Sequence, residues 1–305
     1  MLHRLAFHAM GSQMLAVLEQ ESEQVPPVLS CVPEWFEEWE AVLSRFRPES
    51  ELSRLNAMSG QPVHVSQILW DVFKAALVTE AATAGLVTPT VLDAVVQAGY
   101  DRSFEVLPQA QFRPVSQMPV EVNPLAEVTW DEASRMIYLP EGVHLDLGGV
   151  AKGWAAHQAV LRLGAHGPAL VDAGGDIAIG GPQINGEPWP VGVAEPFNPA
   201  EEFAVLHVGA CGVATSGKDR RRWTQSDKLH HHLIDPRTGQ SAETDVLTAT
   251  VVAATVMEAE AAAKAAFILG SQEGLAWIED DPNLAGLLVL DDGQVICSQR
   301  LQPYL

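Results

Sequence analysis

The sequence predicts a mixed α/β protein in which mixed sheets are flanked by helices, arranged as a single compact domain with two lobes. Three observations lead to this class. Residues 66–85 have the apolar spacing of an amphipathic helix, residues 142–164 have the pattern strand, Gly-Gly turn, helix, and residues 168–217 contain several apolar runs typical of strands. With 305 residues, 47% of them hydrophobic, the chain can bury a sizeable core, and we assign residues 1–305 to one domain.

The first half of the chain is predicted to hold a strand pair and several helices. Residues alternate between apolar and polar on either side of "MGS", which predicts a hairpin over 3–18. Helical spacing and helix-starting residues predict three helical segments: 33–46, a turn begun by Ser50 and Glu51, and 66–85, which Gly85 ends. A proline-marked turn and a short helix follow in "LVTPTVLDAVVQAGYDRSF", and the proline-rich residues 107–124 are predicted to be a surface loop.

The second half is predicted to be rich in strands. "GVHLDLGGVAKGWAAHQAVLRLG" predicts a strand, a turn and a helix that ends at Gly164, and "PALVDAGGDIAIGG" predicts one buried strand. The two glycines and Asp176 inside that strand indicate close approach of another backbone or of a ligand. Further strands are predicted in "PWPVGVAEP", in "EEFAVLHVGACGVATSG" and over 230–234, 245–254 and 284–298. A helix over 256–269 is opened by a Thr255–Glu258 capping box and stopped by Gly270.

The composition limits the classes of partner. The chain has 39 acidic and 18 basic side chains, a formal net charge of −21, which argues against nucleic acid or an anionic membrane because both require a basic face. Three cysteines without CxxC spacing (Cys31, Cys211 and Cys297) argue against a disulfide framework or a structural zinc site. Because no stretch resembles a signal peptide or a membrane span, we expect a cytoplasmic protein.

Two stretches are candidates for binding an anion. In "LDLGGVAKG" (145–153) a Gly-Gly turn opens a helix, and N–H groups at a helix N-terminus attract phosphate. Lys152 would add a positive charge there, and Asp146 would accept from a ribose or adenine group; a tight turn with a solvated lysine is the alternative. "SGKDRRRW" (216–223) gathers four basic side chains in five positions of an acidic chain, and is either an anion site or a solvated turn.

Three consecutive histidines precede a turn in "HHHLIDPRTG" (230–239). If 230–234 is a strand, His230 and His232 share one face while His231 points away, so the three cannot ligate one ion. One histidine at a strand end can act as a general base near neutral pH, whereas three half-exposed strand histidines without a role are the alternative. "PRTG" forms a turn that Gly239 permits.

Glu260 and Lys264 are four residues apart on the predicted helix 256–269. With Glu first, this spacing favours a surface salt bridge that stabilises the helix by about 0.2–0.5 kcal/mol. That interpretation requires no functional role for the helix.

Taken in order, several of these stretches resemble the FAD:protein FMN transferases, the ApbE-type flavin transferase family. The matching pieces are "MGS", "FRPESELSRLN", "VTPTV", "DLGGVAKG", "DAGGDI", "HLIDPRTG" and "MEAEAAAKAAFILG", and together they span almost the whole chain. The resemblance implies a flavin-transferase-like α/β domain that binds FAD and uses Mg²⁺ to help split its pyrophosphate. FMN would move through a phosphoester bond to a Thr or Ser of a target flavoprotein, and AMP would leave.

The resemblance also implies the site residues. The FAD site would be lined by Met10, Phe46, Val87, Thr88, Pro89, Asp146, Lys152 and Ile234. Gly149 would offer a backbone carbonyl to the metal and Glu260 a carboxylate. His232 would be the base that activates the acceptor hydroxyl, which leaves His230 and His231 as strand surface.

This chain departs from the family pattern at three places. Val87-Thr88-Pro89 stands where the family usually has "FDP", and Asp172 replaces the Asn before "AGGD". The metal-binding Asp and Thr of the last helix correspond to Glu260 and Lys264. Glu displaces the ligand oxygen, Mg²⁺ demands near-ideal octahedral geometry, and a protonated lysine is no ligand.

Two functions therefore stay open. The first is a working transferase with altered metal dependence, in which Lys264 neutralises the pyrophosphate directly, without the Lewis acidity of a metal. The second is an FAD-binding protein that has lost transfer and acts as a flavin carrier or a slow FAD pyrophosphatase.

Overall fold

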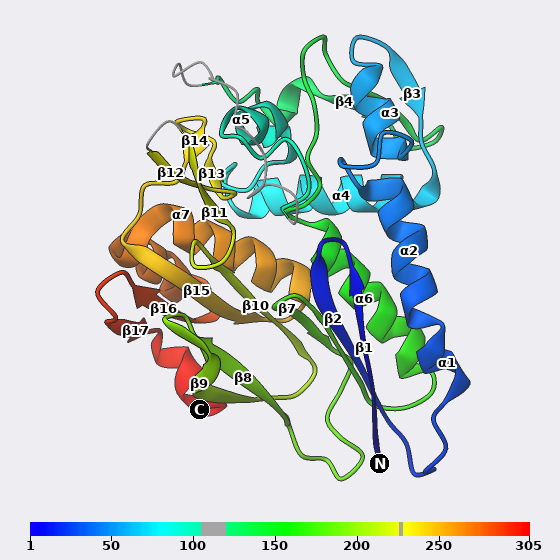
Figure 1. The fold of residues 1–305 in the computed structure, drawn as a ribbon, viewed down its shortest axis with the longest axis vertical. Coiled ribbons are helices and arrows are strands. Elements are labelled where there is room, and N and C mark those ends of the chain that lie inside the picture. Colours follow the sequence, from blue (N-terminus) through cyan, green and yellow to red (C-terminus); the bar gives the residue numbers. More distant parts are fainter. Residues whose placement is uncertain (105–119, 226–227) are drawn as a thin grey trace. The chain divides into compact units, whose positions relative to one another are not determined.

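The computed structural model describes residues 1–104, 120–225 and 228–305 (Figure 1). The chain forms two compact units. Unit 1 comprises Met1–Phe36, Lys152–Asp219 and Thr244–Leu305, and unit 2 comprises Glu37–Ala151 and Arg220–Glu243. The predicted α/β class is confirmed, since helices and sheets alternate along the chain. The assignment of residues 1–305 to one domain stays a prediction.

Unit 1 is built on an eight-stranded sheet of order β1-β2-β6-β7-β10-β15-β16-β17. We expected mixed sheets, but every pairing between its described strands is antiparallel. Short turns join neighbours such as β1 and β2, and a short turn can only reverse the chain direction. The strands are β1 Leu2–Ala9, β2 Ser12–Glu19, β6 Ala169–Ala173, β7 Asp176–Ile179, β10 Cys211–Gly217, β15 Val246–Ala253, β16 Ala285–Leu290 and β17 Val295–Cys297.

Other elements of unit 1 cover both faces of this sheet. The antiparallel ribbon of β8 (Trp189–Glu195) and β9 (Asn198–Val208) packs with the 3-10 helix η4 (Gln299–Tyr304) in one apolar cluster with the sheet. The long helix α7 (Val256–Asp280) packs against β10, β15 and β16. All residues of β15 and β16 are buried, as expected of strands covered on both faces. The remaining helices of this part are α1 (Pro27–Ser30) and α6 (Ala151–Gly164), which begins at the last residue of unit 2.

Unit 2 combines helices with small sheets. Its helical segments are α2 (Val32–Leu43, which starts in unit 1), α3 (Glu51–Ala57), α4 (Gln67–Ala82), η1 (Pro89–Val91), α5 (Leu92–Gln97) and η3 (Leu125–Glu127). Strands β3 (Pro62–His64), β5 (Met136–Tyr138) and β4 (Thr129–Asp131) form one sheet. Two hairpins follow, β11 (Arg222–Gln225) with β12 (Lys228–His231) and β13 (Ile234–Asp235) with β14 (Gln240–Ser241). A small core around Tyr100, Trp223 and Ile234 joins α5 to these hairpins.

Most predicted elements are confirmed, and their boundaries follow local capping. The Ser50 and Ser66 side chains accept from the N–H groups of Ser53 and Leu69 and so begin α3 and α4. The hairpin around "MGS" is formed by β1 and β2, and its turn places Met10 at a positive φ of 48°. Residues 107–119 of the predicted proline-rich loop lie outside the described residues.

Four predictions of single elements were wrong. Residues 143–147 are no strand, because Asn56 and the Pro89 carbonyl, rather than a neighbouring strand, bond their backbone. Residues 168–181 form the hairpin β6–β7, since Gly174 and Gly175 adopt φ of 71° and 100°. The strand over 230–234 is interrupted after His231. Helix α7 breaks at Gly270 as predicted, but resumes because the Asp245 carboxylate accepts from the Ser271 N–H at 2.9 Å.

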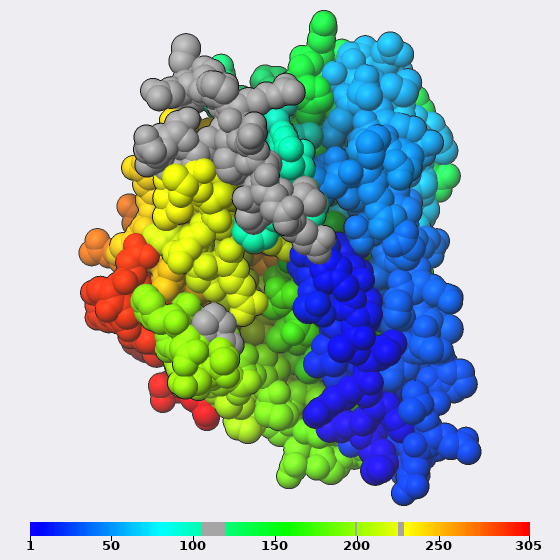
Figure 2. Space-filling model, in the orientation of Figure 1, coloured from blue at the N-terminus to red at the C-terminus, as the bar shows by residue number. Residues whose placement is uncertain are grey.

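Within unit 1 the β1–β2 hairpin contributes exposed surface, in blue in Figure 2. No helix in the described ranges is both long and apolar enough to cross a membrane. The three cysteines are free thiols, as expected, and burial raises the pKa of the Cys211 thiol to about 11.

Candidate active site

The predicted site residues belong to both units. Unit 1 contains Met10, Lys152, Glu260 and Lys264. Unit 2 contains Phe46, Val87, Thr88, Pro89, Asp146, Gly149, His232 and Ile234. In unit 1 the Lys152, Glu260 and Lys264 side chains lie together, and in unit 2 Arg45 contacts both Asp146 and Phe46.

In unit 1, two lysines and two carboxylates meet in one cluster, which we call the lysine–carboxylate cluster: Lys152, Asp176, Glu260 and Lys264. The Lys264 ammonium lies 2.8 Å from Glu260 Oε1, one turn away on α7. The Lys152 ammonium, in the first turn of α6, forms an ion pair with Asp176 at the start of β7 and lies 3.9 Å from the same Glu260 oxygen. The pair on α7 is therefore part of a four-residue network rather than an isolated surface salt bridge.

The cluster is buried unevenly. Only 1% of the Glu260 side chain and 3% of the Asp176 side chain are exposed, against 13% of Lys264 and 15% of Lys152. Burial, followed by the nearby Asp176 carboxylate, raises the pKa of Glu260, and the two ammonium groups act in the opposite direction. The two carboxylate side chains are thus more deeply buried than the two lysine side chains.

Gly153 holds the other oxygen of Glu260. Its N–H donates to Glu260 Oε2 at 3.1 Å. A Cβ at position 153 would lie 2.5 Å from that oxygen, closer than real Cβ contacts permit. The glycine of "AKG" is thus required by the approach of the Glu260 carboxylate to the α6 backbone.

The residues of the cluster do not fit a divalent cation. Both Glu260 oxygens already accept a hydrogen bond, Oε1 from the Lys264 ammonium and Oε2 from the Gly153 N–H. Among residues 1–104, 120–225 and 228–305 no three His, Cys, Asp or Glu side chains are grouped as a metal site. A Mg²⁺ ion prefers several oxygen ligands in octahedral geometry, and an ammonium group at ligand distance repels it.

In unit 2, Arg45 links two of the predicted residues. Its Nε lies 3.0 Å from Asp146 Oδ2, and its guanidinium stacks 4.1 Å from the centre of the Phe46 ring. Nη1 donates to the Tyr100 carbonyl at 2.9 Å. Since only 7% of the Arg45 side chain is exposed, this ion pair is shielded from water.

The segment 87–89 is adjacent to Asp146. The Pro89 carbonyl accepts from the Asp146 N–H at 2.7 Å. The Thr88 side chain caps η1 and shares a 3.0 Å hydrogen bond with Thr90 Oγ1, and the Val87 N–H donates to Thr83 Oγ1. Asp146 Oδ1 also accepts from the Gly148 N–H at 2.7 Å, just before Gly149 and the start of α6.

The three histidines have three different surroundings. His230 stacks on Trp223 with ring centroids 6.4 Å apart. His231 is buried, and its Nε2 lies 3.0 Å from the Ala242 carbonyl, so the prediction that it belongs to the strand surface was wrong. His232 lies in the bend between β12 and β13 and is half-buried. The interruption of the strand thus sets His232 apart from the other two.

The "IDPRTG" turn follows directly. Ile234 is buried in the small core of unit 2, and the Asp235 carbonyl accepts from the N–H groups of Thr238 and Gly239. Gly239 has a φ of 64°, and a Cβ there would overlap the Val120 carbonyl. Within this turn, Arg237 pairs with Asp235 at 2.8 Å. The predicted turn is therefore confirmed and fixes the chain just after His232.

The basic stretch "SGKDRRRW" is divided between the two units, with Lys218 in unit 1 and the three arginines in unit 2. Lys218 is used within unit 1, where its ammonium donates to the Thr244 carbonyl at 2.6 Å and to Asp291 at 2.8 Å. Arg222 begins β11 in unit 2. Lys218 thus has a structural role between the ends of β10, β15 and β16.

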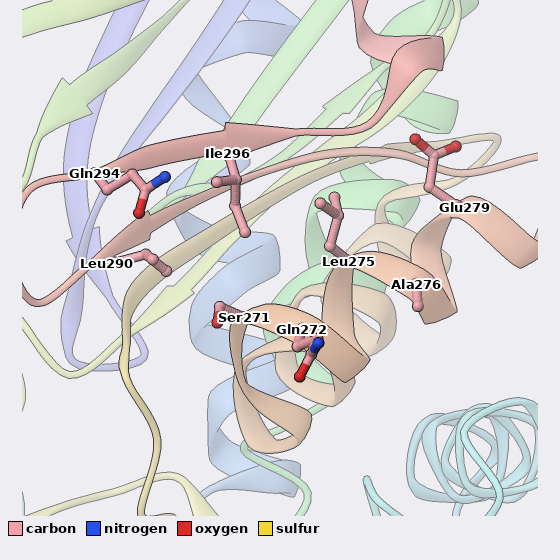
Figure 3. Close-up of a pocket in the computed structure, with 8 residues that line it drawn as sticks. All are labelled: Ser271, Gln272, Leu275, Ala276, Glu279, Leu290, Gln294 and Ile296. Carbon is pink, nitrogen blue, oxygen red and sulfur yellow. The ribbon is translucent and has the colours of Figure 1, made fainter.

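A groove of 540 Å³ lies elsewhere in unit 1, between the second half of α7 and the β16–β17 hairpin (Figure 3). Its lining residues are Ser271, Gln272, Leu275, Ala276, Glu279, Leu290, Gln294 and Ile296. None of the predicted site residues lines this groove.

Comparison with known proteins decides the family. The model of the ApbE family matches residues 10–288, nearly the whole chain. The chain belongs to the ApbE family. Among curated relatives, the FAD:protein FMN transferase of Treponema pallidum is 31% identical over 296 residues, covering 92% of this chain and 82% of the relative. That of Haemophilus influenzae is 28% identical, with the same two coverages.

Solved ApbE structures have the same fold. The crystal structure of the ApbE protein from Thermotoga maritima superimposes with a TM-score of 0.87 at 25% identity, covering 100% of this chain and 99% of that one. The flavin transferase ApbE from Vibrio cholerae gives a TM-score of 0.81 at 24% identity and the same coverage. The fold of this ApbE chain therefore extends over its whole length.

Two residues that the sequence did not indicate contact predicted site residues: Arg45 pairs with Asp146, and Asp176 pairs with Lys152. The sequence indicated Asp176 only as an acidic residue beside two glycines. An arginine next to a predicted ligand-binding residue, in a chain with 18 basic side chains, was the available signal for the first. For the second, an acidic residue within a buried strand requires a cationic partner, and Lys152 is that partner.

Proposed function

We propose that this chain is an FAD:protein FMN transferase, which binds FAD and transfers FMN to a Thr or Ser hydroxyl of a target flavoprotein. The match of the ApbE family model to residues 10–288 carries this proposal. Two curated relatives that are FAD:protein FMN transferases each align with 92% of the chain, which supports the same activity. FAD is thus the substrate and donor, and AMP is the leaving group.

The proposed reaction replaces the phosphoanhydride bond of the FAD pyrophosphate with a phosphoester bond to the acceptor. The acceptor hydroxyl oxygen attacks the phosphorus of the FMN half of FAD, and a new P–O bond forms. The bond from that phosphorus to the bridging oxygen breaks, so AMP leaves with that oxygen. His232 accepts the proton of the hydroxyl as general base. Its place in a bend, fixed by the following "IDPRTG" turn, supports this role.

The remaining proposed roles concern FAD. In unit 2, Phe46, Val87–Pro89, Asp146 and Ile234 would contact the dinucleotide, and the Arg45 guanidinium, paired with Asp146 and stacked on Phe46, would keep both in place. In unit 1, Met10 and Lys152 are the residues proposed to contact FAD. The three free thiols support the further proposal that the enzyme works in a reducing compartment, the cytoplasm.

A second candidate is an FAD-binding protein without transfer activity, a flavin carrier or slow FAD pyrophosphatase. Lys264 at a position predicted to be a metal ligand is the observation that favours it. It leaves His232 and the turn that follows it without a role, which is why we prefer the transferase.

Mass spectrometry of a candidate acceptor flavoprotein tests the proposal. Purified protein is incubated with FAD and the acceptor, and a gain of one FMN on a Thr or Ser is expected. His232→Asn should abolish the gain while FAD still binds, and the neighbouring variant His230→Asn should retain transfer. Release of AMP without any modified acceptor, under conditions where another family transferase modifies it, would instead identify a pyrophosphatase.

A further inference from the structure

We propose that the Lys264 ammonium takes the place of a divalent cation in this enzyme, so that FAD is bound and its pyrophosphate neutralised without Mg²⁺. The proposal rests on the proposed function, since it concerns how the same site holds FAD. It is carried by the lysine–carboxylate cluster of unit 1, Lys152, Asp176, Glu260 and Lys264.

The charge of the cluster is already balanced. Two ammonium groups face two carboxylates, and Glu260 Oε1 is 2.8 Å from Lys264 and 3.9 Å from Lys152. A divalent cation at this place would add two positive charges next to two buried ammonium groups. Such uncompensated charge in a buried site is strongly unfavourable.

The burial of the four side chains also argues against a metal ion in the cluster. The carboxylates are almost completely covered, whereas the two lysine side chains keep 13% and 15% of their surface. An incoming cation therefore meets the lysine side chains before it reaches a carboxylate oxygen. An incoming phosphate meets the same groups and is attracted, because ammonium groups donate charge-assisted hydrogen bonds to phosphate oxygens.

Two hydrogen bonds to Glu260 hold the cluster in place. The Gly153 N–H donates to Glu260 Oε2, and the glycine leaves room for that carboxylate against the α6 backbone. Glu260 in turn anchors Lys264 from the adjacent turn of α7. Glu260 is thus a positioning residue, and Lys264 is the residue that contacts the pyrophosphate.

An ammonium group can perform the required electrostatic work. As the bond between the FMN phosphorus and the bridging oxygen breaks, negative charge grows on the phosphate oxygens, and a positioned cation stabilises it. Lysine supplies this charge as a point donor and needs no further ligands. Transfer then depends on Lys264 rather than on the metal concentration.

The test measures FAD binding and metal binding directly, without the transfer reaction. The full-length protein is titrated with FAD, following flavin fluorescence, once with Mg²⁺ and once with EDTA. Titration of the FAD complex with Mn²⁺, followed by electron paramagnetic resonance, reports a bound divalent ion. We expect the same Kd for FAD in both buffers and no stoichiometric Mn²⁺ binding.

Variants assign the effect to the ammonium group. Lys264→Met should weaken FAD binding by about 10–100-fold, the value of one charge-assisted hydrogen bond, and Lys264→Arg should restore most of it. Lys264→Met alone leaves the buried Glu260 carboxylate without one of its cationic partners, which could unfold the protein. The double variant Glu260→Gln/Lys264→Met removes both charges, so it should stay folded and show the same loss of FAD affinity. Lys74→Met, at an exposed lysine of α4, is the matched control and should bind FAD normally.

The outcomes separate this inference from the proposed function. Tight FAD binding only with Mg²⁺, stoichiometric Mn²⁺ binding, or wild-type affinity in the double variant would each overturn the role of Lys264 and leave the transferase intact. Absence of FAD binding in either buffer would overturn the proposed function, and this inference with it.

Discussion

Replacing Gly153 with alanine is expected to destabilise the protein, because the glycine is where α6 touches the buried Glu260 carboxylate. The added Cβ would lie 2.5 Å from Glu260 Oε2 and 3.5 Å from its Cδ. Neither atom can move freely, since the Glu260 side chain is 1% exposed and is also held by Lys264 at 2.8 Å. The overlap must therefore displace the carboxylate, the helix or both.

The magnitude follows from three opposing contributions. Overpacking costs about 1–3 kcal/mol, and a lost hydrogen bond to a charged group costs about 1.5–3 kcal/mol. Alanine in place of glycine inside a helix returns about 1 kcal/mol. The free energy of unfolding should thus fall by about 1.5–5 kcal/mol.

Gly164→Ala in the same helix is the matched control. Gly164 is exposed, and no atom lies within 4 Å of its added Cβ, so this change should be neutral or stabilising by up to about 1 kcal/mol. At about 2–4 °C per kcal/mol, thermal unfolding should place the Tm of Gly153→Ala about 3–24 °C below that of Gly164→Ala. Equal Tm values for the two variants would refute the contact between Gly153 and Glu260, and with it the anchoring of Lys264.

Three further predictions concern other parts of the molecule. Arg45→Met should lower the free energy of unfolding by about 3 kcal/mol in denaturant titrations, because it removes one partner of the shielded ion pair with Asp146; it should also weaken FAD binding. Arg47→Met removes one partner of an exposed ion pair and should cost less than about 1 kcal/mol. Equal effects of the two substitutions would contradict the shielding of the Arg45–Asp146 pair. Asp245→Ala should cost about 1 kcal/mol at neutral pH through loss of the cap on Ser271. Since hydrogen bonds from Ser271 lower the pKa of Asp245 from 3.8, the wild-type advantage is complete above pH 3.8 and should disappear as the pH falls through the lowered value; an advantage unchanged at pH 2 would argue against it. A thiol reagent at pH 8 should label exposed Cys297 first and Cys211 only on unfolding, because burial raises the pKa of Cys211 to about 11, and Cys297→Ser should remove the fast phase.

Local signals in the chain predicted most helices and turns correctly. Ser50, Ser66 and Thr255 start helices because their side chains accept from backbone N–H groups three residues on, an interaction that depends only on neighbouring residues. Gly239 at the end of "PRTG" adopts a positive φ in the turn that local sequence predicted. The ordered set of short motifs predicted the family, and hence which residues to examine.

Contacts between distant residues were not predictable in this way. The extended segment 143–147 has the pattern of a strand, but its hydrogen-bond partners, Asn56 and the Pro89 carbonyl, are more than 50 residues away along the chain. The resemblance left His231 on the strand surface, but His231 is buried because its ring bonds the Ala242 carbonyl just after β14, a contact that the local sequence does not indicate. The second half of α7 exists because Asp245, from a different element, caps it.

The lysine–carboxylate cluster shows most clearly which properties the sequence determines and which depend on the tertiary structure. Residue types and spacing alone established that Glu260 and Lys264 are one turn apart and that a lysine stands at a position where the family resemblance implies a metal ligand. They left open whether that pair is a solvated salt bridge or part of a site, because its energy depends on the surrounding dielectric. Packing of α6 and β7 against α7 buries Glu260, adds Asp176 and Lys152, and leaves the two lysine side chains more exposed than the carboxylates. Whether lysines or carboxylates are the more accessible groups of the site thus depends on how deeply each side chain is buried, which the tertiary structure alone decides.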